Sequence, residues 1–445
     1  MKRCRSFFSL LLCALICFSI SGKALAAGTE PFGLTVAVDG TETVVRAYDN
    51  DYPGNLYLSL TDLSRALNGT AKQFRLTYSN SQTDGEVFSL TTGQPAADTK
   101  PVNAGQSRAA ASLTLRRNRL IVDGKERRYY TYRADGGELY MSLVDVQLML
   151  DLRAEYLSAD RIALHPDEPF VPDVKTLAAE GYFDAFNGVL LGDANTGKIL
   201  YYSFSIRAVP IASLSKLMTY LLVAEAVERG DISYDDTVTI SQAASTLSRS
   251  ADGMVFLAAG AAVPLSELLE AMLLASSNES ALALAEHVAG SEASFVERMN
   301  ARAKELGLLS ARFYTPHGLP VYTESAVPAK LQNRMSASDM FKLTRILLDR
   351  FPEITEITSK LYGSMPTLGY TTANSNPLVF NMDGVTGLKT GSTNRAGYCL
   401  VASMPLAVGE ETHTVVAIVL GAESADVRGQ AAQLLLYYAR DFFGE

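Results

Sequence analysis

The chain has 445 residues, with 48% hydrophobic and 20% charged residues. This length predicts two or three folding units, and the composition is typical of globular proteins, which excludes a disordered or fibrous chain. Since 39 Lys and Arg face 48 Asp and Glu, the net charge of −9 gives little electrostatic support for a nucleic-acid partner.

The first 26 residues have the pattern of a secretory signal. Basic residues at positions 2, 3 and 5 precede an apolar run over 7–20, and Ala24-Leu25-Ala26 supplies the small residues that signal peptidase reads. A run of about 14 residues is shorter than the roughly 20 that span a bilayer, so an uncleaved anchor is the lesser alternative. We expect an exported chain at the cell wall or membrane surface, with no transmembrane helix after cleavage.

Cysteine usage agrees with export. Three of the four cysteines lie in the signal, and only Cys399 remains. One thiol forms no internal disulfide and no cysteine-type metal site, so the fold must be stabilised by packing. Cleavage also removes four basic residues, and the mature charge becomes 35 − 48 = −13.

Residues 27–165 contain an internal duplication. Val38-Asp39-Gly40 recurs as Val122-Asp123-Gly124, and the segment 56–63 recurs as 139–146, with offsets of 84 and 83 residues. Each Asp-Gly pair predicts a hairpin turn between short strands. In each copy, a Ser-Leu-x-Asp stretch predicts the capped start of a short helix.

Strands around a turn followed by one short helix resemble the copper-amine-oxidase N-terminal-like modules. A copper site is not expected, because His165 is the only histidine before position 287. We expect a mostly-β domain with two repeats that serves as a structural or wall-contacting spacer.

The segment 166–175 follows this domain and predicts a semi-rigid linker, because prolines cluster at its start. A second domain is expected over 176–445, with an early strand pair, helices in the middle and strands again near the end. Such an order predicts one sheet completed by the last strands and a helical subdomain inserted between them. The expected strands are 189–191, 199–202, 385–390, 397–404 and 413–421; the expected helices are 213–229, 265–288, 293–306 and 425–442.

The segment Ser213-Leu214-Ser215-Lys216 lies where an expected helix begins. Side chains three apart on a helix share a face, so the Lys216 amine can reach the Ser213 hydroxyl. The helix dipole and partial burial should lower the lysine pKa and make it a base toward Ser213. Alone the pattern is weak, because a serine near a helix start is usually only a cap.

Two further segments add to this pattern. Ser276-Ser277-Asn278 interrupts an apolar helical stretch, and alone it would indicate an ordinary helix end. Lys389-Thr390-Gly391-Ser392 lies in a strand-like segment of small residues, where the plain alternative is an exposed lysine. In this order the three segments are the signature of penicillin-recognising serine acyltransferases.

From about 187 to 441 the chain resembles the D-alanyl-D-alanine carboxypeptidases of the low-molecular-mass penicillin-binding proteins, serine peptidase family S11. Further segments match, among them 193–198, 210–219, Pro316-His317-Gly318-Leu319 and 396–399. The resemblance implies an α/β (α+β) fold of the penicillin-binding-protein and β-lactamase type, with an antiparallel sheet flanked by helices and a helical subdomain. It implies no cofactor and no metal.

The resemblance also assigns roles to residues. Ser213 would attack the terminal D-Ala-D-Ala bond of a peptidoglycan stem peptide, Lys216 would take its proton, and Ser276 would relay a proton to the leaving D-alanine. The N–H groups of Ser213 and Ser392 would form the oxyanion hole. β-Lactam antibiotics would be covalent inhibitors. The implied substrate-binding residues are Asn278, Lys389, Thr390, Gly391, Ser392 and Arg428.

The chain departs from the family pattern at two positions. Glu279-Ser280 stands where Asp-Ala is usual, and Ser392 stands where some relatives carry His. Neither change removes a reacting group. Two other functions stay open: a β-lactamase, although no Glu-x-x-Leu-Asn pattern occurs, and a non-catalytic wall-binding protein.

Overall fold

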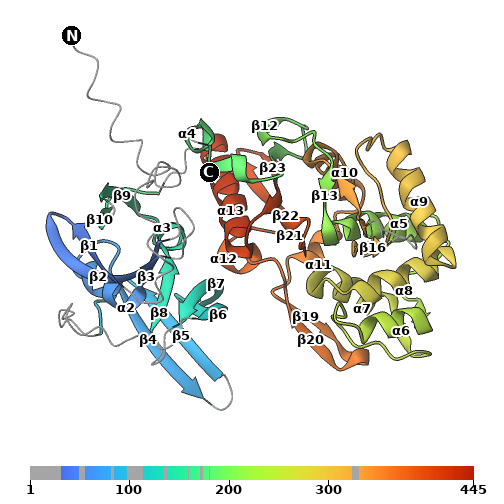
Figure 1. Cartoon of the computed structure of the whole chain (residues 1–445), viewed down its shortest axis with the longest axis horizontal. Helices are drawn as coiled ribbons and strands as arrows, with labels where there is room; N and C mark the ends of the chain where they lie inside the picture. The colour runs from blue at the N-terminus through green and yellow to red at the C-terminus, as the bar shows by residue number, and fades with distance from the viewer. Residues whose placement is uncertain are drawn as a thin grey trace, which may run out of the picture. The chain divides into compact units, whose positions relative to one another are not determined.

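The structure, a computed structural model, describes residues 32–49, 56–81, 85–97, 114–133, 138–158, 160–170, 174–179, 181–322 and 330–444 (Figure 1). The expected signal lies outside these ranges. The chain divides between Tyr182 and Phe183 into two compact units, and each is described by itself. No helix within the described ranges has both the length and the apolar character that a membrane crossing requires.

The N-terminal unit is built on a ten-stranded sheet with the order β4-β5-β6-β7-β8-β3-β2-β1-β10-β9. The first copy of the duplication supplies strands β1 to β5 and helix α2, and the second copy supplies β6 to β10 and α3. The elements of the first copy are β1 (Phe32–Val38), β2 (Thr41–Asp49), β3 (Leu56–Ser59), α2 (Leu60–Ala66), β4 (Phe74–Ser81) and β5 (Gly85–Thr92). Those of the second are β6 (Thr114–Val122), β7 (Lys125–Arg133), β8 (Leu139–Ser142), α3 (Leu143–Leu150), β9 (Arg153–Ser158) and β10 (Arg161–His165).

The predicted Asp-Gly hairpins are confirmed in both copies. Asp39 and Gly40 join β1 to β2 with φ of 48° and 78°, and Asp123 and Gly124 join β6 to β7 with 49° and 80°. Two successive residues with positive φ define the type I′ turn, which matches the twist of the paired strands. The same sequence pair therefore produces the same turn twice.

The predicted helix starts are confirmed as well. The Ser59 hydroxyl accepts the N–H of Asp62 at 3.1 Å at the start of α2, and the Ser142 hydroxyl accepts the N–H of Asp145 at 3.0 Å at the start of α3. Each bond satisfies a donor that the first helical turn leaves without a partner.

The two copies are interleaved in the sheet. Strands β3 and β8 pair antiparallel at its centre. The end of each copy, however, pairs with the start of the other: β5 lies parallel to β6, and β10 lies parallel to β1. Each copy therefore completes the sheet of its neighbour.

The C-terminal unit contains a five-stranded antiparallel sheet with the order β12-β11-β23-β22-β21. Its strands are β11 (Gly188–Asp193), β12 (Ile199–Ser203), β21 (Gly387–Thr393), β22 (Gly397–Val408) and β23 (Glu411–Ala422). Helix α13 (Ala425–Phe443) packs on β22 and β23, and α10 (Ala337–Arg350) packs on β11 and β23 (Figure 1). The predicted sheet, built from both ends of this domain, is confirmed.

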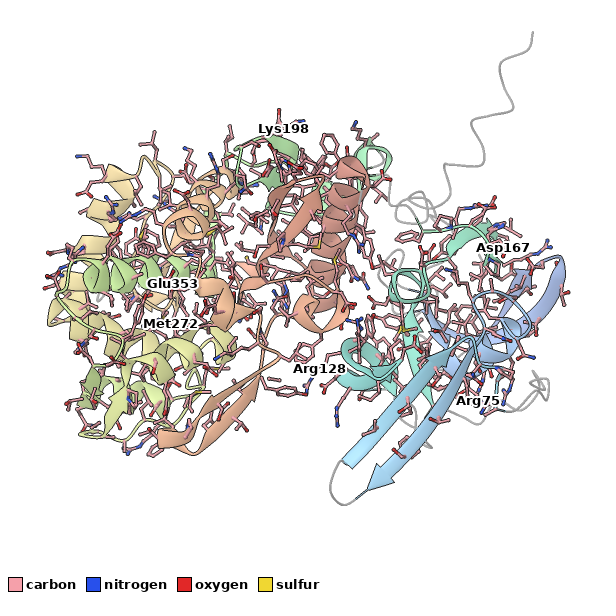
Figure 2. All side chains as sticks on the ribbon, turned by 180° about the vertical axis from the view of Figure 1, so that it is seen from behind. Arg75, Arg128, Asp167, Lys198, Met272 and Glu353 are labelled. Atoms are coloured by element: carbon pink, nitrogen blue, oxygen red, sulfur yellow. The ribbon has the colours of Figure 1, made fainter. Side chains whose placement is uncertain are left out.

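Helices between β12 and β21 form a second layer, which shares one hydrophobic core with the sheet and in which Met272 is fully buried (Figure 2). The main ones are α5 (Lys216–Glu228), α6 (Gln242–Ser248), α7 (Leu265–Glu270), α8 (Asn278–Ala289) and α9 (Glu292–Glu305). Helix α4 (Val174–Ala179) ends the N-terminal unit, and η1 (Tyr182–Ala185) spans the division of the chain. The shorter elements of the C-terminal unit are β13 (Val209–Pro210), η2 (Ala212–Ser215), β14 (Thr237–Thr239), β15 (Ala262–Pro264), η3 (Ala271–Ala275), β16 (Val321–Tyr322), β17 (Lys330–Leu331), β18 (Arg334–Met335), α11 (Ile354–Thr358), β19 (Tyr362–Met365), η4 (Pro366–Leu368), β20 (Tyr370–Ala373) and α12 (Leu378–Asn381).

The prediction of one helix over 265–288 is wrong. Helix α7 passes into a π-helical turn, η3, and the chain then breaks at Ser276, whose φ is 62°. Helix α8 starts afresh, because the Ser277 hydroxyl accepts the N–H of Ser280 at 3.0 Å. The break places Ser276 and Asn278 at the end of one helix and the beginning of the next.

Candidate active site

Ser213 lies in the 3₁₀ turn η2, which leads into α5. Ala212 just before it has a φ of 48°, an uncommon conformation for a residue with a side chain. Two glycines approach this turn closely: a Cβ on Gly318 would lie 2.1 Å from the Ala212 carbonyl oxygen, and one on Gly391 would lie 3.0 Å from the Ser213 nitrogen. The turn is thus held between the 315–319 loop and strand β21.

The Lys216 amine reaches Ser213 as the spacing predicted. Its Nζ lies 2.8 Å from the Ser213 Oγ, 2.8 Å from the Asn278 Oδ1 and 2.8 Å from the His317 carbonyl oxygen. A neutral amine has two hydrogens and one lone pair. Because an amide oxygen and a carbonyl oxygen accept the two hydrogens, the lone pair is left to face the Ser213 hydroxyl.

Lys216 is fully buried. Burial lowers its pKa well below the usual value, the charge of Lys389 lowers it further, and the carboxylate of Glu279 acts in the opposite direction. The expected direction is therefore found, with a different cause: complete burial and a neighbouring lysine dominate. Such an amine can be neutral at a pH where an exposed lysine is charged.

Asn278 and Ser276 occupy the helix break between η3 and α8. The Asn278 amide accepts from Lys216 and donates from Nδ2 to the Asp252 carbonyl oxygen at 2.8 Å. Ser276 is half-buried, and within the described residues no hydrogen bond joins its side chain to Ser213 or Lys216. The structure therefore brings Ser213, Lys216 and Asn278 into direct contact and leaves Ser276 beside them.

Lys389, Thr390, Gly391 and Ser392 follow one another on strand β21. The alternative of an exposed strand lysine is wrong, because Lys389 is buried and its Nζ donates to the Thr390 carbonyl oxygen at 3.0 Å. Burial, with the charge of Arg428, lowers the pKa of Lys389 to about 7. The Thr390 hydroxyl lies 2.8 Å from the Ser375 hydroxyl, and Ser392 is exposed.

Arg428 lies in the first turn of α13, within the helix expected over 425–442. It is 5% exposed and therefore not a solvated surface arginine. Its guanidinium carbon is 5.9 Å from the centre of the Tyr398 ring, and its charge acts on the pKa values of Lys389 and Cys399. Arg428 therefore adds positive charge behind strand β21.

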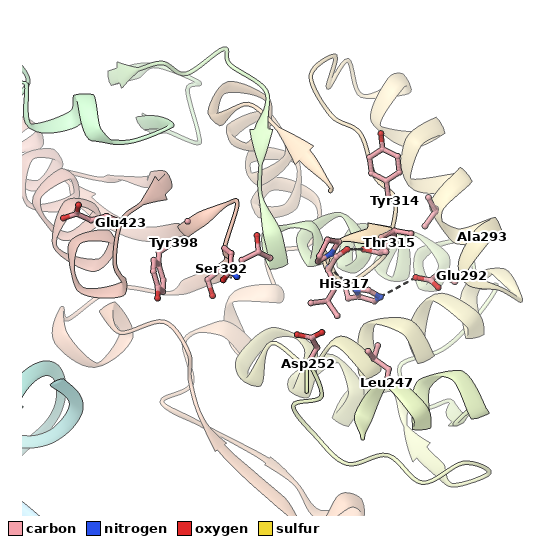
Figure 3. A pocket seen from close by; sticks show the side chains of 17 residues that line it. Leu247, Asp252, Glu292, Ala293, Tyr314, Thr315, His317, Ser392, Tyr398 and Glu423 are labelled. Atoms are coloured by element: carbon pink, nitrogen blue, oxygen red, sulfur yellow. Dashed lines mark hydrogen bonds and ion pairs between the residues drawn. The ribbon is translucent and has the colours of Figure 1, made fainter. Parts of the chain in front are cut away.

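A groove of about 1200 Å³ runs past the exposed end of β21 (Figure 3). Ser392 and Tyr398 line it on the side of the sheet, and Asp252 and Leu247 line it on the side of the helices. His317 also lines the groove, near Asp252, with its Nε2 3.5 Å from a Glu292 carboxylate oxygen. An extended chain lying along β21 would enter this groove.

Several contacts of the site could not be assigned from the sequence. The His317 carbonyl is a main-chain group, and its loop is held by the Thr219 hydroxyl, which donates to the Pro316 carbonyl at 2.6 Å. The matching segment 316–319 was the only signal for this loop. Within the described ranges, no group of three or more His, Cys, Asp or Glu side chains could hold a metal ion.

Residues 178–424 match the D-alanyl-D-alanine carboxypeptidase family, peptidase family S11. The chain belongs to this family. Membership confirms the resemblance inferred from the three motifs, and the fold class is confirmed by the structural relatives of the same family. The resemblance of the N-terminal repeats to copper-amine-oxidase N-terminal-like modules stays a prediction.

Curated members of the carboxypeptidase family include D-alanyl-D-alanine carboxypeptidase DacF of Bacillus subtilis, 34% identical over 259 residues, which are 58% of this chain and 62% of the relative. DacD of Escherichia coli is 33% identical over 258 residues, 57% of this chain and 63% of the relative. The chain thus spans just under two thirds of the length of these two relatives.

Solved structures give the same family. A peptidoglycan synthesis regulatory factor (PBP3) of Streptococcus pneumoniae is 32% identical with a TM-score of 0.52, covering 58% of this chain and 73% of that one. Penicillin binding protein 6B of Escherichia coli is 31% identical with a TM-score of 0.51, covering 57% and 77%. The share of this chain that each of these structures covers is about the size of the C-terminal unit.

Proposed function

We propose that the chain is an exported serine-type D-Ala-D-Ala carboxypeptidase that removes the terminal D-alanine from peptidoglycan stem pentapeptides. The observation that carries this proposal is the 2.8 Å contact between the Lys216 Nζ and the Ser213 Oγ. The lysine is buried, and both of its N–H groups have acceptors. A hydroxyl beside a neutral amine held in this way is an activated nucleophile.

The reaction has two halves. In the first, the Ser213 oxygen bonds to the carbonyl carbon of the D-Ala-D-Ala peptide while Lys216 takes the hydroxyl proton. The C–N bond then breaks, and the leaving D-alanine nitrogen receives a proton, for which we assign the relay to Ser276. In the second half, water attacks the Ser213 ester and gives a proton to Lys216; the ester C–O bond breaks, the shortened peptide leaves as a carboxylate, and the proton returns to the Ser213 oxygen.

The substrate would be held along strand β21. Its terminal carboxylate would meet the charge of Lys389 and the hydroxyl of Thr390, with Arg428 adding positive charge behind them. The N–H groups of Ser213 and Ser392 would stabilise the oxyanion, and Gly391 allows the two segments to approach closely. The Asn278 amide, fixed by Lys216 and Asp252, would bind a substrate amide, and the rest of the stem peptide would lie in the groove.

The remaining parts of the chain are assigned on the sequence. We propose residues 1–26 as a signal, 27–165 as a spacer domain, 166–175 as a linker and 176–445 as the catalytic domain. β-Lactams would acylate Ser213 because their strained amide enters the same site. The acidic net charge argues that recognition of the wall is local and not a bulk attraction.

The test is made on the purified chain, with a stem pentapeptide and with labelled penicillin. The wild type should release D-alanine and carry a covalent label, and Ser213→Ala should do neither. Ser359 is an exposed serine at the C-terminal end of α11, so Ser359→Ala is the matched control and should behave as the wild type. Absence of both release and label in the wild type contradicts the proposal, and rapid turnover of the penicillin would indicate a β-lactamase instead.

A further inference from the structure

Glu279 is a fully buried carboxylate that the proposed mechanism does not use. It follows Asn278 in the first turn of α8, at one of the two positions where the chain departs from the family pattern. A buried carboxylate is costly unless other groups solvate it. Its partners therefore show what it stabilises.

The partners of Glu279 are main-chain groups of one loop. Its Oε1 accepts the N–H of Met254 at 3.0 Å and also the N–H of Val255. The neighbouring Asn278 donates to the Asp252 carbonyl of the same loop at 2.8 Å. Two successive side chains of α8 thus hold the segment 252–255, which lies between α6 and β15.

This segment is one wall of the active-site groove. Asp252 lines the groove opposite Ser392 and Tyr398 (Figure 3). Val255 and Leu257 are buried, so the loop is anchored on one side, whereas Met254 and Phe256 are about half exposed. The hydrogen bonds from Glu279 and Asn278 of α8 therefore fix the position of this side of the groove.

The same segment is connected to the nucleophile by consecutive hydrogen bonds. Asp252 holds the Asn278 Nδ2, the Asn278 Oδ1 holds the Lys216 Nζ, and the Lys216 Nζ contacts the Ser213 Oγ. Since the amide of Asn278 is a rigid plane, a shift at its Nδ2 end also moves its Oδ1 end. Displacement of the loop would reach Lys216 through one side chain.

We propose that Glu279 is a positioning residue of the active site: its carboxylate fixes the 252–255 wall of the groove and, through Asn278, the position of Lys216, while its charge faces the Lys216 amine. This inference rests on the proposed function for its kinetic consequences. The loop contacts themselves do not depend on that function.

The charged groups facing Lys216 come from three directions. Lys389 lies on β21, Glu279 on α8 and His317 on the 315–319 loop, with Arg428 beyond Lys389 and Glu292 beyond His317. Burial and Lys389 lower the pKa of Lys216, and Glu279 opposes them. Because Lys216 acts when neutral, acylation rises as the pH passes its pKa. Loss of the Glu279 charge should lower this pKa and move the rising limb to lower pH.

Two substitutions separate position from charge. Glu279→Asp keeps the charge but is one methylene shorter, so it should release the loop. We expect faster hydrogen exchange at the Met254 and Val255 amides, about tenfold slower acylation by labelled penicillin, and an unmoved rising limb. Glu279→Gln keeps the length but loses the charge, so its rising limb should move to lower pH. Glu286→Gln, two turns along the same helix, is the control for a charge change alone.

The proposal is overturned if exchange at Met254 and Val255 is unchanged in Glu279→Asp, or if Glu279→Gln and Glu286→Gln have the same pH profile as the wild type. Exchange over the rest of α8 identifies a variant that is generally unfolded, in which case the other variant decides. Failure of the proposed function would look different, because the wild type itself would take no label, while the exchange measurement would still report on the loop.

Discussion

Single residues set opposite requirements in this site. In the proposed mechanism Lys216 must be neutral to accept a proton, whereas Lys389 must be charged to attract a carboxylate. Both are buried, and burial together with a neighbouring positive charge disfavours the charge of each. Burial lowers both pKa values, and the proposed mechanism requires Lys216 to lose its proton while Lys389 keeps its own. Peptide hydrolysis is therefore expected to have a bell-shaped pH profile.

The falling limb of that profile is a specific prediction. Since the pKa of Lys389 is about 7, the free protein loses this charge as the pH rises through 7, and kcat/KM for a stem pentapeptide should fall there. In Lys389→Arg the charge persists, because a guanidinium stays protonated. We expect its kcat/KM to be lower at neutral pH but without a falling limb near pH 7, measured by D-alanine release. A limb that stays in place in Lys389→Arg would assign it to another group.

The sequence indicated which motif residues of the C-terminal unit lie together better than it indicated their surroundings. Ser213, Lys216 and Asn278 were found because spacing on a helix and the order of motifs are visible in sequence, and the structure brings them into contact. The His317 carbonyl could not be found, because every residue has a carbonyl group. The burial of Arg428 was also missed, since burial of a charge depends on packing between distant elements.

Among the elements of the fold, short irregular segments contribute the residues of the candidate active site. The turn η2, the break at Ser276 and the 315–319 loop all depart from regular geometry, and regular helices and strands hold them. The polar triplet 276–278 marked the interruption in the sequence, but the expected helix 265–288 ran across it. The π-helical turn before it was not predicted, because the apolar run Ala271–Ala275 fits the period of an α-helix as well.

Gly318 offers a test of how the loop positions Lys216. Its φ is 92°, and a Cβ would lie 2.1 Å from the Ala212 carbonyl oxygen, so Gly318→Ala must displace the loop or the turn η2. We expect penicillin acylation to slow by about a hundredfold, as a misplacement of roughly 1 Å can cost that much.

Gly307→Ala is the matched control for this substitution. Gly307 also has a positive φ, of 67°, but a Cβ there would meet no atom within 4 Å. It should share the backbone strain and keep the acylation rate. Equal rates in both variants would show that the close contact at Gly318 does not hold the site.

The whole molecule consists of two units with separate hydrophobic cores. One core is formed by residues between Leu34 and Leu164, the other by residues between Leu190 and Leu420. The sequence predicted two domains, because the repeats and the motif-bearing segment do not overlap. The pairing of strands between the two repeats could not be predicted, since strand order depends on contacts between both copies.

Two cores predict two thermal transitions in calorimetry of the full chain. Acylation by penicillin at Ser213 should raise the midpoint temperature of the C-terminal unit's transition only, because the acyl group would be bound by the folded form of that unit. Leu58→Ala, in the N-terminal core, should lower the unfolding free energy of the N-terminal unit by about 2–5 kcal/mol and so lower the midpoint of the other transition. A single transition that responds to both changes would mean that the units unfold together.

The interleaved pairing of β5 with β6 and of β10 with β1 has a consequence for assembly. In a chain with one copy of the repeat, β1 would still pair with β2 but its other edge would be open, and the closing hairpin would have no sheet to join; open strand edges invite association. Two such chains would satisfy each other by exchanging hairpins about a twofold axis. The duplicated unit therefore has the architecture of a swapped homodimer carried on one chain, and its assembly is independent of concentration.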